Sequence, residues 1–442
     1  MKKESKKTEK ISYYNSGKEI TLGAWYSPDL VEQLWAWYKE AEFNEITLFP
    51  TNEETAEYLS EGLAFCKKYG INAHLYMDNK DTSFGKPWSE ILKGYETVVT
   101  GFDVCDEPLG DKRYSSMTGR PDIDDLKFGV DFLLKNYPDK QFTVTLWPNY
   151  ACADQVSMGE GKGYEDYVKK YCEEILAPLP QGVKRWIGTD FYPYYTNRFD
   201  GKLLNNLELL QYYAKRYGAD LYLYVQVMDS KTLNWRYPNE KELSLQYYVA
   251  LAYGVKNIQV FCYQEPKELL RGEFGYKDGK AMIIDGYTPR YDENGVLLPR
   301  VYERTQSYFD VQQLNRNLKK LSEAYMDFEW QGVLNVRGDL RWDRDDFSSL
   351  AHTLSAYDGV GRCRAEENLI VGCFKDGKGN DGYMLTNYSD PTDFKDSFVE
   401  IEFTGKTTAI VYRKDECYTV ELDDGKYTVT LCGGEGVFVI PQ

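Results

Sequence analysis

The stretch Gly101-Phe-Asp-Val-Cys-Asp-Glu-Pro-Leu-Gly110 ends an apolar run in two acids and a proline. Pro108 has no N–H for a β-ladder, so a strand that enters this stretch must stop at Glu107. A carboxyl group at the C-terminal end of a buried strand is well placed for acid–base chemistry, because catalytic groups collect at the C-terminal ends of parallel strands. Asp-Glu-Pro is also typical of a solvated turn, and the motif alone does not separate the two interpretations.

A pair of carboxyl groups at the ends of barrel strands could catalyse glycoside hydrolysis, a reaction that uses two of them. One is protonated and gives its proton to the leaving oxygen, while the other attacks the anomeric carbon or activates a water. Glu107 is the candidate acid, since like charge at Asp103 and Asp106 favours its protonated form. Acids at the ends of two other predicted strands, Asp190 and Glu265, are the candidate partners. We therefore expect Glu107, Asp190 and Glu265 to be catalytic.

Strands and helices alternate over about the first three hundred residues, the size of a (β/α)₈ TIM barrel. Helical patterns lie between β-rich runs, and several of them end at a glycine. A doubly wound sheet is the alternative, but no Gly-x-Gly-x-x-Gly turn follows the first strand. The predicted strands are Ile20–Tyr26, Glu45–Pro50, Ile71–Asp78, Thr97–Glu107, Phe142–Asn149, Trp186–Tyr194, Leu221–Met228 and Asn257–Glu265.

Side chains alternate along a strand, so parity assigns the face that points to the barrel axis. The clearest strand is Leu221–Met228, where apolar residues at every second position leave Gln226 on the inner face. Parity places these residues inward: Trp25, His74, Asp103, Cys105, Glu107, Trp147, Asn149, Asp190, Tyr192, Tyr222, Tyr224, Met228, Phe261, Tyr263 and Glu265. Aromatic rings stack on sugar faces. The expected sugar contacts are Trp25, His74, Asp106, Trp147, Asn149, Tyr192, Gln226, Tyr263 and Trp235.

A helical pattern from Pro299 to Phe328 is expected to close the barrel. Short strands separated by turn residues follow it, and Asp423-Asp-Gly425 is typical of a hairpin turn. These strands predict an antiparallel β-sandwich. The expected domains are a disordered tail at 1–18, the barrel at 19–328 and the sandwich at 329–442.

Composition narrows the class of partner. The chain has 442 residues, a net charge of -17 and a pI of about 4.8. Such a surface disfavours nucleic acid and anionic membranes. His74 and His352 are the only two histidines and no Cys-x-x-Cys pair occurs, so we expect neither a metal site nor a cofactor. No stretch is apolar enough to span a bilayer, and no signal peptide is recognisable at the start; we expect a cytoplasmic protein, or an exported one whose signal was trimmed.

Three segments resemble glycoside hydrolases of clan A, the barrel superfamily of cellulases and β-galactosidases. Asp106-Glu107-Pro108 resembles their Asn-Glu-Pro, and Asp190-Phe-Tyr-Pro193 resembles their strand-six tyrosine segment. The stretch Ala281-Met-Ile-Ile-Asp-Gly-Tyr-Thr-Pro289, followed by Gln313-Leu-Asn315, is similar to their barrel-closing passage. The resemblance implies a carbohydrate-active barrel with a terminal β-sandwich, in which Glu107 is the general acid/base and Tyr192 a site tyrosine.

The chain departs from this pattern at strand seven, where the family has its nucleophilic glutamate. Here the inward position carries Gln226, and Asp106 stands in place of the usual asparagine. Three functions stay open at this point: a glycoside hydrolase whose second carboxylate comes from another strand, a catalytically silent carbohydrate-binding barrel, and a metal-assisted lyase or isomerase.

Overall fold

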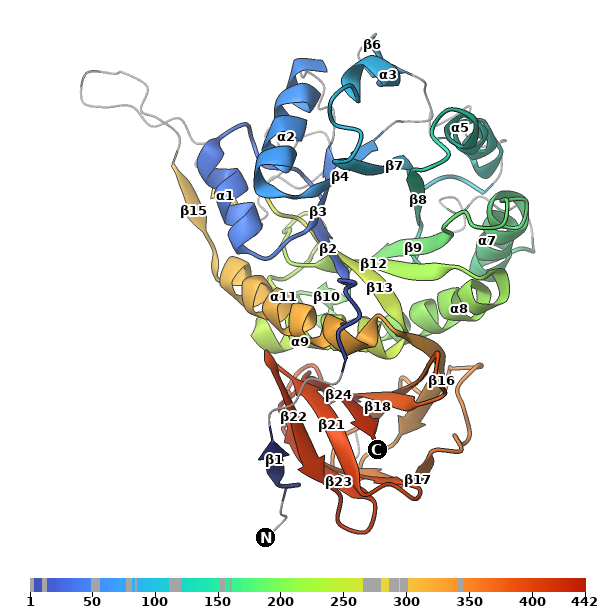
Figure 1. Cartoon of the computed structure of the whole chain (residues 1–442), viewed down its shortest axis with the longest axis vertical. Helices are drawn as coiled ribbons and strands as arrows, with labels where there is room; N and C mark the ends of the chain where they lie inside the picture. Colours follow the sequence, from blue (N-terminus) through green and yellow to red (C-terminus); the bar gives the residue numbers. More distant parts are fainter. Residues whose placement is uncertain are drawn as a thin grey trace.

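The chain folds into a barrel followed by a sandwich, as Figure 1 shows for the computed structural model. The model describes residues 4–9, 14–48, 56–76, 82–83, 86–110, 121–151, 156, 158, 161–264, 280–285, 294, 301–339 and 345–442.

Eight parallel strands form the barrel, which confirms the predicted fold. In spatial order they are β2 (Thr21–Ala24), β13 (Val255–Phe261), β12 (Asp220–Gln226), β9 (Trp186–Phe191), β8 (Gln141–Leu146), β7 (Val99–Asp106), β4 (Asn72–Tyr76) and β3 (Glu45–Leu48). Asn44 links the first and last of these strands, because its N–H donates to the Leu22 carbonyl (2.9 Å) and its Oδ1 accepts from the Leu22 N–H (2.8 Å).

Helices cover the outside of the strands. Local chemistry sets their ends: capping boxes at Asp122 and Asn239 start two of them, and Gly218 ends another in the left-handed conformation, which glycine adopts without steric cost. The helices are α1 (Glu32–Glu40), α2 (Ala56–Tyr69), α3 (Trp88–Ile91), α5 (Ile123–Asn136), α7 (Tyr164–Tyr171), the π-helical turn η1 (Cys172–Leu176), α8 (Lys202–Tyr217), α9 (Glu240–Ala252) and α11 (Gln306–Tyr325). The helix expected at 299–328 is shorter at both ends.

Strand β7 contains a bulge that changes its inner face. Asp103 pairs with Thr143 of β8, but Cys105 pairs with the very next residue, Val144, so β7 has one extra residue between them. Cys105, expected to face inward, instead packs in the layer between the strands and the helices. Asp106 takes the inner position, where its charge raises the pKa of Tyr222 and Tyr224 after the larger effect of burial.

The C-terminal region is the predicted antiparallel sandwich. Its seven-stranded sheet has the order β1-β22-β21-β24-β19-β18-β16 and faces a three-stranded sheet, β17-β20-β23, across an apolar core. The strands are β16 (Phe328–Val336), β17 (Val360–Ala365), β18 (Leu369–Asp376), β19 (Asp381–Asn387), β20 (Ser397–Phe403), β21 (Thr408–Arg413), β22 (Glu416–Glu421), β23 (Lys426–Leu431) and β24 (Gly436–Pro441). Short pairs elsewhere are β5 (Thr82–Ser83) with β6 (Lys86–Pro87), β10 (Tyr194–Tyr195) with β11 (Arg198–Phe199), and β14 (Ile283–Asp285) with β15 (Tyr302–Arg304).

The beginning of the chain joins this sandwich. Strand β1 (Lys7–Glu9) pairs antiparallel with β22, and Glu4 accepts the N–H of Thr430 in the smaller sheet (2.9 Å). The expected disordered tail is therefore wrong for residues 4–9. The physical reason is that the edge of β22 has unpaired backbone groups, which a charged strand satisfies without needing an apolar pattern.

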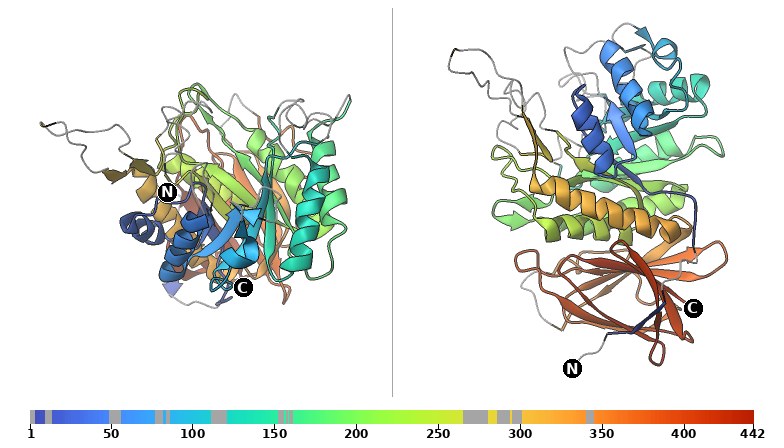
Figure 2. Two further views of the ribbon diagram at one scale, coloured as in Figure 1. Left: turned by 90° about the horizontal axis from the view of Figure 1, so that it is seen from above. Right: turned by 60° about the vertical axis from the view of Figure 1, so that its left-hand side comes forward.

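Helices α9 and α11 lie between the barrel and the sandwich (Figure 2). The Thr386 hydroxyl donates to the Tyr248 carbonyl on α9 (3.1 Å), and the Ser244 hydroxyl donates to the Gly434 carbonyl (3.0 Å). Helix α9 is therefore buried all round, which explains why its sequence has no polar face. None of the helices described in the structure combines the length and apolarity needed to cross a membrane.

Lys256 is a buried cation at the start of β13. Its Nζ donates to the carbonyls of Tyr325 (3.0 Å), the last residue of α11, and of Phe328 (2.9 Å), the first residue of β16. It also lies 4.0 Å from the centre of the Tyr325 ring. Burial is the largest cause that lowers the pKa of Lys256, to about 7. The two carbonyls only partly replace the water that a free ammonium would bind.

This lowered pKa predicts a pH dependence of stability. The unfolded chain binds the Lys256 proton more tightly than the folded chain, so the cost of burying the charge is complete below pH 7 and disappears as pH rises towards the unfolded value of roughly 10.4. Between pH 7 and 10 we expect the wild type to gain a few kcal/mol relative to Lys256→Met, at about 1.4 kcal/mol per pKa unit. Urea unfolding at several pH values measures this gain, with the exposed Lys93→Met as control. A difference between Lys256→Met and wild type that does not vary with pH contradicts it.

Candidate active site

An aromatic wall lines one side of the barrel mouth. We use this name for Trp25, Tyr76, Tyr192, Tyr224, Trp235 and Phe261, which pack in one cluster at the C-terminal ends of the strands. Trp25 meets Tyr224 edge to face, with ring centroids 5.2 Å apart, and Tyr192 lies 4.8 Å from Trp235 and 5.2 Å from Phe261. Trp25, Tyr192 and Trp235, three of the expected sugar contacts, are thus brought together.

Two acidic residues lie close to this wall, at the ends of β7 and β9. Glu107 follows β7 with a φ of 52°, which few residues other than glycine adopt, and its N–H donates to the Thr145 carbonyl (2.8 Å). Asp190 occupies an inner position of β9 and is 8% exposed. Burial first, and then the charges of Asp190 and Glu107 among others, raise the pKa of Tyr150. Both carboxyl groups therefore lie within electrostatic reach of one phenol.

A polar layer fills the barrel below the mouth. His74 Nε2 lies 3.4 Å from Glu45 Oε2, and the amides of Asn257 and Gln259 donate to Glu45 Oε1 at 3.3 and 3.2 Å. Burial raises the pKa of Glu45, and the charge of Asp103 adds to that effect. His74, an expected sugar contact, lies in this layer and is 3% exposed. It therefore supports the mouth from below.

Asp103 connects this layer to the aromatic wall. Its Oδ2 accepts from the Thr47 hydroxyl (2.7 Å) and its Oδ1 from the Thr143 hydroxyl, and Thr47 also shares a hydrogen bond with Tyr224. Gly101 leaves the space that the layer needs, because a Cβ there would lie 2.6 Å from His74 Nε2. Buried hydrogen bonds of this kind restrict where Asp103, Thr47 and Tyr224 can lie.

Two expected sugar contacts that follow β8, Trp147 and Asn149, lie away from the inner face of the barrel. Trp147 packs in the core between strands and helices, with its main-chain N–H donating to the Tyr167 hydroxyl (3.4 Å). Asn149 donates from Nδ2 to the Lys202 carbonyl (3.2 Å) at the start of α8. The inner face expected for both residues is corrected on these contacts. Strand β8 ends at Leu146, so its alternation does not extend to them.

Tyr263 was expected on the inner face and lies instead in the helix layer. Its hydroxyl donates to the Leu34 carbonyl on α1 (2.8 Å), and its ring packs against Tyr38 at 4.9 Å. The ladder of β13 stops at Phe261, so parity counted through Tyr263 has no ladder to follow. Glu265, expected as a catalytic partner, lies outside the described residues.

Gln226 is completely buried and its side chain is bound by main-chain groups. Its Oε1 accepts from the Tyr194 N–H (2.9 Å), and the carbonyls of Tyr194, Arg236 and Met228 lie 3.0, 3.1 and 3.3 Å from its Nε2. These contacts direct the amide into the loops that follow β9 and β12. We therefore withdraw Gln226 as a sugar contact.

Two tyrosines near the acids were not among the expected site residues. Tyr150 follows β8, and Tyr195 lies in the loop after β9, where it shares a hydrogen bond with Trp235. Both follow the C-terminal end of a barrel strand, and that position was a usable signal in the sequence. Nothing in the periodicity predicted the contacts of either side chain: the Tyr150 ring meets the Phe191 ring with centroids 5.0 Å apart, and Tyr195 bonds to Trp235.

Within the described part of the chain, no group of three or more His, Cys, Asp or Glu residues is arranged to hold a metal ion. The barrel mouth offers carboxyl, hydroxyl and aromatic groups, which suit acid–base chemistry on a polyhydroxylated ligand.

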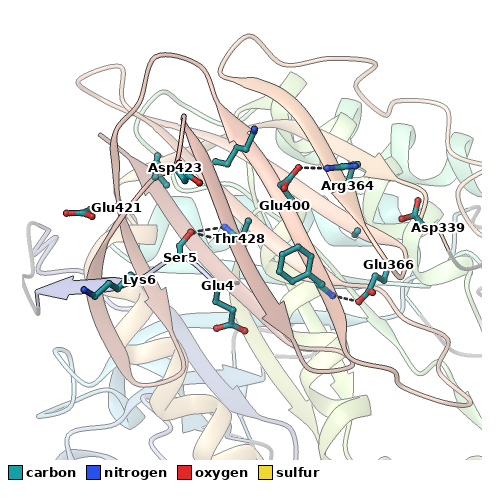
Figure 3. Close-up of a pocket in the computed structure, with 14 residues that line it drawn as sticks. Glu4, Ser5, Lys6, Asp339, Arg364, Glu366, Glu400, Glu421, Asp423 and Thr428 are labelled. Carbon is teal, nitrogen blue, oxygen red and sulfur yellow. Dashed lines mark hydrogen bonds and ion pairs between the residues drawn. The ribbon is translucent and has the colours of Figure 1, made fainter. Parts of the chain in front are cut away.

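A concavity lies on the sandwich, over the smaller sheet and beside residues 4–6 (Figure 3). It measures about 730 Å³. Arg364 pairs with Glu400 (2.7 Å), and Glu366 accepts the N–H of Phe398 (2.9 Å). These groups bind one another, and Phe398 is the one aromatic ring among the described residues of the lining, so the barrel mouth is the better candidate site.

No family model matches the chain, and no curated protein matches its sequence. Solved structures that are similar to it include a GH27 β-L-arabinopyranosidase from Geobacillus stearothermophilus, with 9% identity over 96% of each chain and a TM-score of 0.45. They also include an α-amylase from Anoxybacillus (12% identity, 95% of this chain and 91% of that one, TM-score 0.43) and an exo-β-1,4-mannosidase from an Opitutaceae bacterium (12%, 71% and 62%, 0.41). Similarity at this level concerns the fold alone.

Proposed function

We propose that this protein is a glycoside hydrolase that cleaves a carbohydrate at the barrel mouth. The observation that carries the proposal is that the aromatic wall and the carboxyl groups of Glu107 and Asp190 lie at the same end of the barrel. Aromatic faces bind the apolar face of a sugar ring, while carboxyl groups supply the acid and the base that glycosidic cleavage needs. A sugar bound against the wall would have its glycosidic oxygen within reach of these carboxyl groups.

Glu107 is the proposed general acid, and Asp190 is the proposed partner. Strand β8 lies between β7 and β9, so the backbones that carry the two acids are about two strand spacings apart, on the order of 9–10 Å. Carboxyl groups on strands that are not adjacent reach the wider spacing of an inverting pair, about 6.5–9.5 Å, more easily than the roughly 5–5.5 Å of a retaining pair, so we expect an inverting reaction with a water between the sugar and the base. Protonated Glu107 gives its proton to the leaving oxygen as the bond between that oxygen and the anomeric carbon breaks. Asp190 takes a proton from the water, whose oxygen bonds to the anomeric carbon.

Charge restricts the proposed substrate. The chain carries a net charge of -17, and the carboxylates of Asp106 and Asp190 add negative charge at the mouth itself. Anionic sugars would be repelled by this field. A neutral glycan is therefore the proposed substrate class.

A panel of aryl glycosides of neutral pyranoses, in both anomeric forms, tests the proposal. We expect release of the aryl group from at least one member, at a rate that saturates with substrate. The second candidate, a silent carbohydrate-binding barrel, is favoured by the engaged amide of Gln226 at the strand-seven position. Sugar binding by calorimetry without hydrolysis of any member would support that second candidate and overturn the first.

A further inference from the structure

Gln226 connects the two loops that carry the end of the aromatic wall. One loop follows β9 and contains Tyr192 and Tyr194, and the other follows β12 and contains Trp235 and Arg236. The Gln226 amide bonds to main-chain groups in both loops: the N–H and carbonyl of Tyr194 in the first, and the Arg236 carbonyl in the second. Arg236 is adjacent in sequence to Trp235, and Tyr194 is two positions after Tyr192, so both bonded residues are close in sequence to a ring of the wall.

The two loops also bond to each other directly above Gln226. The Arg236 N–H donates to the Tyr194 carbonyl (3.1 Å), and the Thr196 N–H donates to the Asn234 carbonyl (2.9 Å). Trp235 pairs with Ser230 within its own loop, through main-chain bonds of 2.8 and 3.2 Å. The loops thus form a small sheet whose underside is completed by the buried amide.

Helix α9 holds Gln226 itself in place. The Gln226 N–H donates to Gln246 Oε1 (2.8 Å), and Gln246 Nε2 donates to the Gln226 carbonyl (3.0 Å). Both glutamines are buried, at 0% and 1% exposure. The main chain of Gln226 is thus bonded to α9 and its side chain to the two loops, so Gln226 links the loops to the helix.

We propose that Gln226 is a positioning residue that holds the Tyr192–Trp235 pair in the geometry that binds a sugar ring. The sugar in this statement rests on the proposed function, whereas the loop contacts do not. An amide suits the position because it offers both a donor and an acceptor to these main-chain groups. A glutamate would turn a donor into an acceptor facing three carbonyl oxygens and would bury a charge, so restoring the acid of clan A here does not create a nucleophile.

Hydrogen exchange followed by mass spectrometry tests the positioning step without any substrate. In Gln226→Met, which keeps the length and removes the bonds, we expect amides of 192–199 and 228–238 to exchange about tenfold faster, the effect of losing one or two hydrogen bonds. Exchange in β8 should be unchanged. Gln211→Met, which removes another buried glutamine on α8, is the matched control and should leave both loops as in wild type. Equal exchange of the loops in Gln226→Met and wild type overturns the proposal.

Binding of cellotriose, mannotriose and xylotriose tests the consequence for the wall. For a trisaccharide that the wild type binds, we expect Gln226→Met to raise Kd about three- to tenfold, as much as Trp235→Ala does, which is the usual worth of an aromatic contact. In kinetics the loss should appear in KM more than in kcat. Faster loop exchange with an unchanged Kd overturns the positioning role.

Two further outcomes are decided by the same data. If the wild type binds none of the sugars, the proposed function fails while the exchange result still decides the loop contacts. If Gln226→Met does not fold, wild-type exchange decides: the Tyr194 amide, which donates to a buried oxygen, should be strongly protected. Exchange of that amide at the rate of an unprotected loop would overturn the proposal.

Discussion

Replacing Glu107 with Gln is expected to lower turnover roughly 10²–10⁴-fold, the usual worth of a positioned general acid. The amide has the same shape but cannot give a proton to the leaving oxygen. The main-chain bond from Glu107 to the Thr145 carbonyl does not involve the side chain and is retained. Fold and sugar binding should therefore stay close to wild type, as thermal unfolding and calorimetry would show.

Comparing substrates with different leaving groups tests whether the lost group is a proton donor. An aryl glycoside with a very acidic phenol needs little help from a proton donor, so Glu107→Gln should lose much less activity on it than on a glycoside with a poor leaving group. The exposed Glu173→Gln serves as the control and should be silent on both substrates. Equal losses on the two substrates, or a fall in stability with activity per folded molecule unchanged, would mean that Glu107 is not the acid.

Replacing Asp190 with Asn is the second large effect, with an expected loss of roughly 10²–10⁴-fold in turnover because the base is removed. The introduced amide could still form hydrogen bonds but could not accept the proton of the attacking water. Asp200→Asn is a matched control: Asp200 is equally buried, at 8% exposure, and accepts from the Lys202 N–H (3.1 Å). Its substitution should leave turnover largely unchanged.

The stereochemistry of the wild-type reaction distinguishes the proposed pair of acids from a retaining pair. NMR of the first-formed sugar should show inversion at the anomeric carbon, as the separation of β7 and β9 favours. A retained configuration contradicts the assignment of Asp190 as base. Full activity in both Asp190→Asn and Glu265→Gln would remove both candidate partners and favour the silent binding barrel.

Parity along regular strands was sufficient to predict much of the aromatic wall. Tyr224 of the wall, and Tyr222 two positions before it, face the axis as their alternation with leucine and valine indicates, because the ladders of β12 with β9 and β13 run through both residues. The barrel itself was predictable for the same reason. Repeated β-rich and helical segments each bury one face, and eight of them close a single layer of strands.

Parity fails wherever the ladder is irregular or ends. The bulge in β7 exchanges the faces of Cys105 and Asp106, and no glycine stands at residues 103–106 to indicate it. Tyr263 and Asn149 lie beyond the last paired residue of their strands, where the chain is directed by contacts with α1 and α8. A rule of alternate sides holds only while successive residues are held in one extended ladder.

The amino-acid sequence was enough to establish the fold class, the strand ends that bear Glu107 and Asp190, and the lack of a glutamate at position 226. Which groups those residues meet depends on the packing of distant segments. Gln226 binds main-chain groups of Tyr194 and Arg236, which come from separate loops, and Lys7 pairs with a strand more than four hundred residues away. Hydrogen bonds to main-chain atoms do not depend on the side chain of the partner, so they leave no pattern in the sequence from which the pairing could be read.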